Sequence, residues 1–288
     1  MTEPLSIGAL RQRAISLSIE EKTVKPFTRL SIALFCLGVA LSGDAKIDEE
    51  TILGIWLFDE DLKNTVRDAS GNGHDGQVFG KPKVVDGKFG KALSFSGAGD
   101  KIEIPHDDVF TTPTFTLMAW VNVEDLATGW RMIVGKDAWP DRNYAMFVHQ
   151  NNGRLHCAFG TPVLRDRGNF NSKALIVDGT WHHVAFTYDK KVRRAYVDGE
   201  LDTEVPLDID PGTPQVPVII SRPPFKGLID EVYIGNAAVE PEDVKTAAEK
   251  GLVEALRIAR DVEPQGKLAI RWGEIKSISR SIAKTYHR

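Results

Sequence analysis

The stretch WHHVAFTYDKKVRRAYVDG, from Trp181 to Gly199, decides the fold of this chain. Its first eight residues are rich in aromatic and β-branched types, which favour strands. The residues Asp189-Lys190-Lys191 connect them to a second apolar run that ends at Asp198-Gly199. Asp-Gly is typical of tight hairpin turns, because glycine tolerates the positive φ that those turns require. The stretch therefore predicts antiparallel strands joined by short turns.

The same pattern continues between residues 50 and 240. Phe115–Val123 is largely apolar on both faces, which predicts a central strand that is buried on both sides. Lys91–Ser96 and Lys101–Ile104 are predicted to pair as a hairpin around residues 97–100. About twelve such strands, with turn signals between them and no alternating helices, predict an all-β, two-sheet antiparallel sandwich of jelly-roll type.

Three separated motifs carry a family resemblance. They are WHHVAFTYD with the following YVDGE, WLFDEDLKNTVRDASGNGHDGQV (Trp56–Val78) and GLIDEVYIGNAAVEPEDV (Gly227–Val244). Together they resemble the laminin-G-like, pentraxin-type jelly-roll domains of the concanavalin A-like lectin/glucanase fold, over roughly residues 52–248. The resemblance implies binding of glycans, proteins or surfaces, often with a structural calcium ion. It also implies that some relatives on the fold are glycoside hydrolases.

Three regions are predicted along the chain. Residues 1–45 form an N-terminal extension with a signal peptide, residues 50–240 the jelly-roll domain, and residues 241–288 a C-terminal helix and tail. Pro241 suits the first turn of that helix. The tail from Val262 to Arg288 carries six lysines and arginines against two glutamates. It is either a solvated extension or a segment that contacts an anionic surface.

The N-terminal region predicts export. Leu30–Leu41 is an uncharged apolar run preceded by Lys25 and Arg29, and it has the length of the core of a signal peptide. Small residues before Ala45 suit cleavage after that position. An uncleaved membrane anchor is the alternative, although the run is short for a bilayer span. The protein is therefore expected to be secreted or held in the cell envelope.

Composition excludes several classes of function. The net charge is −4 and no basic stripe lies between residues 50 and 240, so nucleic acid is not an expected partner. No glycine-rich phosphate loop of the right spacing is present, so no nucleotide cofactor is expected. Cys157 alone remains after signal cleavage, which excludes an internal disulfide. It is expected to be buried as a small apolar side chain.

A calcium site is predicted in the loop that begins at Asp68. The loop places the oxygen donors of Asp68 and Asn72 and the carbonyl of Gly73 at close spacing between glycines, as a hard cation requires. The family resemblance adds Asp230, in GLIDEV, as a late ligand of the same ion. A metal-free loop rich in Asx turns is the alternative.

Two further sets of residues are candidates. Glu200, Asp202 and Glu204 match the E-x-D-x-E pattern of laminarinase-type hydrolases, but alternation on an exposed strand predicts the same letters. Trp139 and Arg142 lie in a predicted loop where an exposed indole and a charged group suit a sugar ring, although the indole could instead fold over the sandwich. The sequence thus predicts an exported, non-catalytic, calcium-stabilised binding module for glycans or for a cell-surface protein. A glycoside hydrolase and a purely structural envelope protein are the alternatives.

Overall fold

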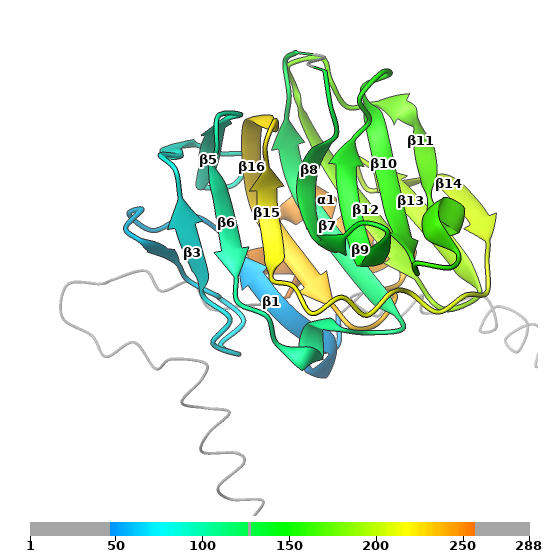
Figure 1. The fold of residues 1–288 in the computed structure, drawn as a ribbon. Helices are drawn as coiled ribbons and strands as arrows, with labels where there is room; N and C mark the ends of the chain where they lie inside the picture. The colour runs from blue at the N-terminus through cyan, green and yellow to red at the C-terminus, as the bar shows by residue number, and fades with distance from the viewer. Residues whose placement is uncertain (1–46, 126–127, 257–288) are drawn as a thin grey trace, which may run out of the picture. The chain divides into compact units, whose positions relative to one another are not determined.

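A computed structural model describes residues 47–125 and 128–256 of the chain. These residues form two antiparallel sheets that stack face to face (Figure 1). The strands of sheet A are β1 (Ile52–Trp56), β4 (Lys83–Asp86), β5 (Lys91–Ser96), β7 (Phe115–Asn122), β12 (Trp181–Tyr188), β13 (Val192–Val197), β14 (Glu200–Pro206) and β16 (Lys226–Gly235). The strands of sheet B are β2 (Thr65–Val66), β3 (Gly76–Phe79), β6 (Lys101–Ile104), β8 (Arg131–Ala138), β9 (Asp141–Val148), β10 (Arg154–Gly160), β11 (Phe170–Leu175) and β15 (Val218–Arg222).

The strand order gives the sandwich its jelly-roll character. Sheet A runs β14-β13-β12-β7-β16-β5-β4, with β1 paired to β16, and sheet B runs β11-β10-β9-β8-β15-β6-β3-β2. Strands far apart in the sequence are neighbours in both sheets, as in β7–β16 and β8–β15. The predicted all-β, two-sheet antiparallel fold is confirmed.

Strand β7 lies in the middle of sheet A, between β12 and β16. All of its residues except the last are buried. Leu117, Ala119 and Val121 point into the core between the sheets, whereas Met118 packs in a second apolar cluster on the other face. The predicted central strand, buried on both sides, is therefore confirmed.

The meander of the deciding stretch is also confirmed. Strands β12, β13 and β14 pair in sequence order. The β13–β14 turn is formed by Asp198 at φ 54° and Gly199 at φ 82°, the two positive values that a type I′ turn requires. The Asp198 carboxylate accepts the backbone N–H of His183 at 3.0 Å, which ties the turn to β12.

The expected hairpin of Lys91–Ser96 with Lys101–Ile104 is wrong. Strand β5 pairs with β4 and β16 in sheet A, whereas β6 pairs with β3 and β15 in sheet B. Residues 97–100 thus carry the chain from one sheet to the other. Asp100 fixes this crossing, because its carboxylate accepts the backbone N–H of Ser96 at 2.8 Å and that of Lys81 at 2.7 Å. A glycine-rich turn signal does not distinguish a hairpin from a crossing between sheets.

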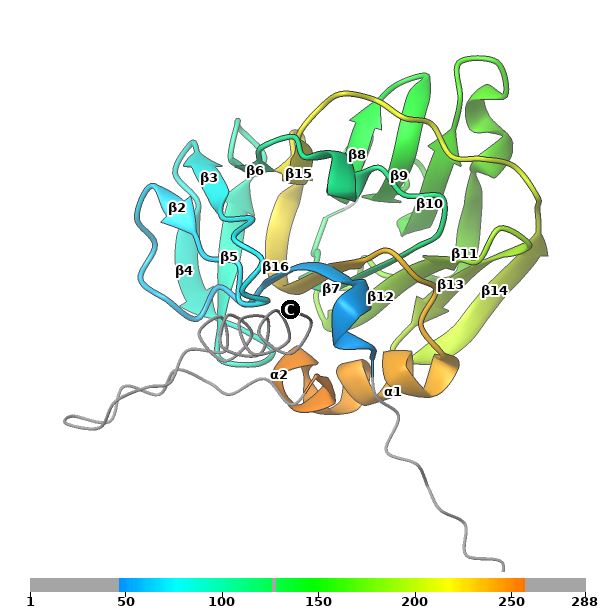
Figure 2. The ribbon, with the colours of Figure 1, turned by 90° about the horizontal axis from the view of Figure 1, so that it is seen from below.

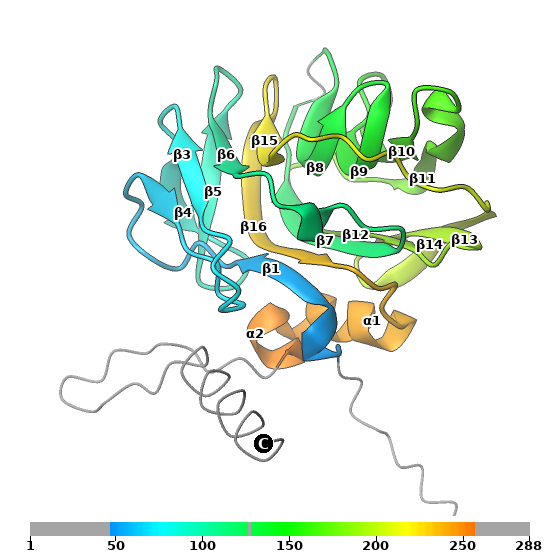
Figure 3. The ribbon, with the colours of Figure 1, turned by 60° about the horizontal axis from the view of Figure 1, so that its bottom comes forward.

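Two short helices, α1 (Pro241–Lys250) and α2 (Leu252–Ala255), cover the outer face of sheet A (Figures 2 and 3). A second apolar cluster lies under them, apart from the main core. It contains Ile47, Ile52, Ile55, Met118, Ala185, Tyr196, Tyr233, Val244, Ala247, Leu252, Ala255 and Leu256. Among the described residues, no helix is long and apolar enough to cross a membrane.

Cys157 is buried in the main core, as expected, and burial raises the pKa of its thiol. The predicted signal segment in residues 1–45 and the basic tail from Val262 to Arg288 lie outside the described residues.

Candidate functional site

The outer face of sheet B is the side of the sandwich that the helices leave uncovered (Figures 1 and 3). Strand register places one row of side chains across five of its strands. The row consists of Asn171, His156, Phe147, Met132 and Arg222, on β11, β10, β9, β8 and β15. Met132 and Phe147 belong to a small apolar cluster of their own and not to the core, which shows that the row points outward.

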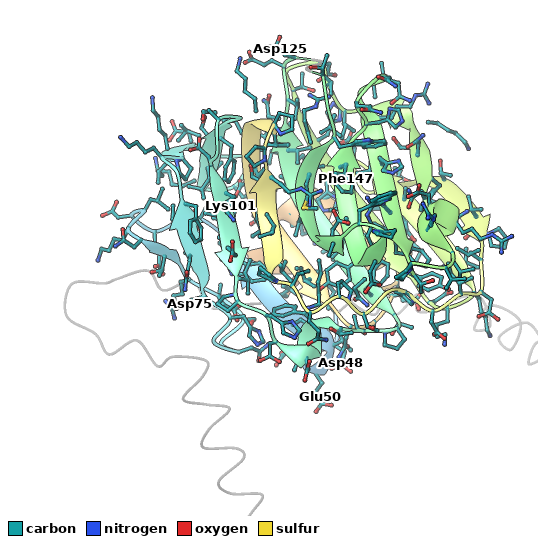
Figure 4. All side chains as sticks on the ribbon, viewed as in Figure 1. Asp48, Glu50, Asp75, Lys101, Asp125 and Phe147 are labelled. Carbon is teal, nitrogen blue, oxygen red and sulfur yellow. The ribbon has the colours of Figure 1, made fainter. Side chains whose placement is uncertain are left out.

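Trp130, just before β8, is an exposed aromatic residue on this face. Its side chain is held by two residues of the row, because the indole lies 4.5 Å from the ring of His156 and 5.9 Å from that of Phe147, between ring centroids. Trp130 is nevertheless 38% exposed. Figure 4 shows Phe147 in the middle of the face that points toward the viewer. The indole is thus fixed by its neighbours while part of it remains open to solvent.

A buried carboxylate holds two arginines beside this aromatic group. The side chain of Asp137 is fully buried and accepts hydrogen bonds from Arg142 Nε and, at 2.7 Å, from Arg222 Nη2. Both guanidinium groups also lie over the ring of Phe147, at 5.6 and 5.7 Å from its centroid. Arg222 keeps 39% of its side chain exposed. The arrangement fixes a planar cation beside the ring of Phe147, which the indole of Trp130 also contacts. We refer to Trp130, Phe147, Asp137 and Arg222 as the Trp130–Arg222 face.

The histidines of this face are uncharged near neutral pH. Burial lowers the pKa of His156 to about 4. The hydrogen bond to Asn171 raises this pKa, but its effect is smaller than that of burial. Burial also lowers the pKa of His149, whose ring lies 4.9 Å from the indole of Trp130. The positive charge beside Trp130 therefore comes from the arginines and not from the histidines.

The two predicted ligand contacts lie at the other end of β8. Trp139 follows β8 directly and is 57% exposed, with the guanidinium of Arg165 at 6.0 Å from its ring. Arg142 is the second residue of the next strand, β9, and only 13% of its side chain is exposed. In addition to Asp137, Arg142 pairs with Asp166 at 3.3 Å. Trp139 is thus open to a ligand, whereas the guanidinium of Arg142 is largely engaged.

In the predicted calcium loop, the carboxylate of Asp68 is occupied by backbone donors. Its Oδ1 accepts the N–H groups of Ile55 and Ser70, and its Oδ2 accepts that of His74. The side-chain amide of Asn72 donates to the carbonyl of Ile52 at 2.8 Å. These bonds tie the loop to β1. They are the bonds expected of a loop that Asx turns organise.

Asp230, the fourth predicted ligand, lies in a different set of contacts. It is fully buried in β16, and its Oδ2 accepts the backbone N–H groups of Lys88 and Phe89 at 2.9 and 3.0 Å. Its Oδ1 has no hydrogen-bond partner. Burial raises the pKa of Asp230 to about 7 against the effect of these N–H donors, and the negative charge of Asp59 adds to the rise.

The turn between β4 and β5 wraps closely around both carboxylates. Asp59 Oδ1 accepts the backbone N–H of Lys91 at 2.8 Å. A Cβ atom at Gly90 would lie 1.9 Å from Asp59 Oδ1, and one at Gly87 would lie 2.6 Å from Asp230 Oδ2. Only glycine therefore fits at these two positions. Two neighbouring carboxylates, one with an unpartnered buried oxygen, are a setting that a divalent cation would stabilise.

Asp59 is a residue that the sequence reasoning missed. It lies three residues after the end of β1 in WLFDED, next to the acidic residues Glu60 and Asp61. Nothing in the local sequence distinguishes Asp59 from Glu60 and Asp61. In the described parts of the chain, no group of three or more histidine, cysteine, aspartate or glutamate side chains is placed to hold a metal. Calcium at Asp59 and Asp230 would therefore need backbone carbonyls and water for the rest of its six to eight oxygens.

The three carboxylates of the hydrolase pattern do not form one site. Glu200 pairs with Lys245 of α1 at 2.8 Å, and Glu204 pairs with Arg194 of β13 at 2.6 Å. Asp202 lies where the register of β14 against β13 shifts, and it accepts the backbone N–H groups at 173 and 174 of β11. Each carboxylate thus has a separate partner on a different element, and Asp202 links the edges of the two sheets.

Comparison with known proteins places the chain in a family. Residues 96–245 match the model of the concanavalin A-like lectin/glucanases superfamily. A comparison with curated protein sequences gives no match. Among solved structures, domain 4 of AbnA, a GH43 extracellular arabinanase from Geobacillus stearothermophilus in complex with arabinotriose, is similar at a TM-score of 0.55. It is 24% identical, over 69% of this chain and 98% of that domain.

Two more distant structures share the fold. The binding domain of Paraclostridial Mosquitocidal Protein 1 aligns with a TM-score of 0.57 and 14% identity, over 69% of this chain and 52% of that one. The sialidase of Trypanosoma rangeli, in a covalent complex with 2,3-difluorosialic acid, aligns with a TM-score of 0.52 and 17% identity. That match covers 69% of this chain and 33% of the sialidase. The match of the family model, together with the two-sheet jelly-roll fold, shows that this chain belongs to the concanavalin A-like lectin/glucanase superfamily.

Proposed function

We propose that this protein is an exported, non-catalytic module that binds glycans through the outer face of sheet B. One observation carries the proposal. Trp130 is held against His156 and Phe147 yet remains 38% exposed, and Arg222, fixed by Asp137, lies across the same Phe147 ring. A rigid, partly open indole beside anchored hydrogen-bond donors suits a sugar, which has an apolar ring face and a polar edge.

The solved structures support binding in general. The AbnA domain is described in complex with arabinotriose, and the mosquitocidal protein match is a binding domain. At this level of identity the likeness is one of fold. It supports the proposal because the same sandwich serves recognition in those proteins, whereas the ligand of this chain depends on its own face.

Trp139 and Arg142 complete the proposed surface. Trp130 precedes β8 and Trp139 follows it, so the two indoles flank the strand, roughly 30 Å apart at about 3.3 Å per residue. Arg142 and Asp137 lie between them. This spacing suits a chain of several sugar units better than a single sugar.

The arrangement of acidic residues supports a non-catalytic role. A retaining glycosidase needs two carboxylates about 5 Å apart across the bond that breaks. Glu200 and Glu204 instead form ion pairs with different elements, and Asp202 ties two backbone N–H groups.

The proposal includes a calcium ion that stabilises the fold. Asp230 and Asp59 are the residues that would hold it, because the unpartnered Oδ1 of Asp230 lacks a counter-charge. The carboxylate of Asp68 already accepts three backbone N–H groups, so it would be a weaker ligand for the ion than the unpartnered oxygen of Asp230. Export would follow from the predicted signal segment, Leu30–Leu41.

A glycan array with the full-length protein, with and without calcium, tests the proposal. Binding is expected, and Trp130→Ala should abolish it while leaving the melting temperature close to that of the unchanged protein. Leu201→Ala, which trims an exposed side chain on β14 of the other sheet, is the matched control and should bind normally. If the protein binds no glycan but still fractionates with cell walls or membranes, the proposed function is wrong and a structural envelope role is favoured.

A further inference from the structure

The guanidinium of Arg222 has N–H donors that make no observed hydrogen bond. Only one hydrogen bond of Arg222 is observed, from Nη2 to Asp137 at 2.7 Å, whereas a guanidinium has five N–H donors in a fixed plane. The ring of Phe147 supports it at 5.7 Å, and 39% of the side chain is open to solvent. An arginine that is fixed in this way is prepared for two parallel hydrogen bonds to a planar anion such as a carboxylate.

Packing relates the position of Arg222 to that of Trp130. The loop that carries Trp130 contacts the turn that follows Arg222, because a Cβ atom at Gly129 would lie 3.1 Å from the Pro224 ring. Arg222 and Trp130 also pack near the same Phe147 ring. A ligand that extends from the indole across the Phe147 ring would therefore meet the free edge of the guanidinium.

The charge of this half of the sheet also favours an anionic ligand. The segment that forms β8 to β11, residues 131–175, has seven lysines and arginines against three aspartates, an excess of four in a chain whose net charge is −4. Two of the seven, Arg131 and Lys136, are buried, and the others are at least partly exposed. The three aspartates are Asp137, Asp141 and Asp166.

The nearby acidic side chains are already engaged. Asp137 is buried between two arginines, and Asp166 pairs with Arg142 at 3.3 Å. At the rim, Asp125 pairs with Lys226 at 3.4 Å (Figure 4 labels Asp125). An approaching anion would thus meet a local field that favours it, since a cationic surface attracts negative ligands over several ångströms.

We propose that the Trp130–Arg222 face selects glycans that carry a carboxylate, such as uronic or sialic acids. The sugar ring lies against Trp130 and the carboxylate is received by Arg222. This inference rests on the proposed glycan-binding function and adds the chemical class of the ligand. Neutral glycans then bind more weakly at the same face, because they make the aromatic contact without the ion pair.

Matched ligand pairs test the inference on the full-length protein. Oligogalacturonides are compared with their methyl esters, and sialyllactose with lactose, by titration calorimetry at two salt concentrations. The acidic member of at least one pair is expected to bind roughly tenfold tighter or more, a difference that one charge-assisted contact can supply. This preference should weaken as salt is added.

Three variants locate the contact. Arg222→Gln should remove the preference for the acidic ligand and leave the weak binding of the ester unchanged. Arg222→Lys should restore it only in part, because an ammonium group lacks the planar fork. Lys245→Gln removes the same charge from α1, on the helix-covered side of the domain, and should change nothing.

The outcomes separate the two proposals. Equal affinity for the acidic and esterified ligands, with loss of both on Trp130→Ala, overturns the carboxylate inference and leaves glycan binding standing. An equal loss of preference in Arg222→Gln and Lys245→Gln also overturns it, because the effect would then be one of net charge. Failure to bind any of the four ligands or any arrayed glycan, by a protein that melts cooperatively, overturns both.

Discussion

The carboxylate of Asp230 on β16 accepts a hydrogen bond of 3.0 Å from the backbone N–H of Phe89 in the β4–β5 turn, while its second oxygen has no partner. Two segments that are remote in the sequence thus meet at a buried acidic group. With Asp59 nearby, the burial of negative charge opposes folding unless a proton or a cation compensates it.

Calcium is therefore expected to stabilise the protein. At a free concentration one hundred times the dissociation constant, the gain is about 2.7 kcal/mol, which a chelator should remove. Asp230→Ala and Asp59→Ala should abolish the calcium-dependent rise in melting temperature. Asp68→Ala should lower the melting temperature equally with and without calcium, because Asp68 bonds to backbone N–H groups. A calcium response that both Asp68→Ala and Asp230→Ala remove, and that Asp59→Ala leaves intact, would restore the ligand set predicted from sequence.

Substitution of Gly90 tests how tightly the turn encloses Asp59. Gly90→Ala introduces a Cβ atom 1.9 Å from Asp59 Oδ1, at a φ of +71°. Gly73→Ala is the matched control, since its φ is +86° but nothing lies within 4 Å of the new atom. The control should lose about 1–2 kcal/mol for its left-handed backbone, and Gly90→Ala should lose clearly more. Urea unfolding measures both, and equal losses would show that the turn gives way freely.

Acid is expected to destabilise the fold through His183. Burial lowers the pKa of His183 from 6.5 to about 3. The native state therefore disfavours the charged imidazole, so the stability associated with neutral His183 is present above pH 6.5 and is lost as the pH falls toward 3. His183→Gln should unfold with a flatter dependence on pH than the unchanged protein. Parallel curves of unfolding free energy against pH would contradict this role.

Asp202 is expected to matter for stability and not for chemistry. Asp202→Ala leaves the backbone N–H groups of Lys173 and Ala174 without their acceptor, at an expected cost of about 1–3 kcal/mol. Glu200→Ala removes only an exposed ion pair with Lys245 and should cost less than about 1 kcal/mol. Denaturant titration distinguishes these values.

No hydrolysis is expected from the E-x-D-x-E residues. The protein, incubated with β-glucans and a broad panel of polysaccharides, should release no reducing sugar. Release that disappears in Glu200→Gln would establish the hydrolase alternative. Release that persists in Glu200→Gln and Glu204→Gln would indicate a contaminating enzyme.

The elements that sequence predicted well are those that local pattern specifies. Strand β7 is apolar at all but one of its buried positions, and the turn at Asp198 and Gly199 carries its own conformational signal. Strands β5 and β6 were assigned correctly as strands but wrongly as a pair, because their partners lie far along the chain.

The candidate site was harder still to predict from the sequence, because it depends on pairing between distant strands. Arg222, Met132, Phe147 and His156 become neighbours only through the register of four strands, two of which are joined across a long stretch of sequence. No spacing pattern in the sequence predicts that Arg222 and Trp130 lie on the same face. Trp139 and Arg142 could be proposed together from the sequence because only two residues separate them.

The apolar cluster beneath α1 and α2 has a consequence for how the domain is displayed. Ile47 and Leu256, at the two ends of the described domain, both pack in that cluster, on the side opposite the Trp130–Arg222 face. Any tether joined to either end would leave from the back of the sandwich. A domain held on a surface by such a tether would point the Trp130–Arg222 face outward, where ligands in solution could reach it.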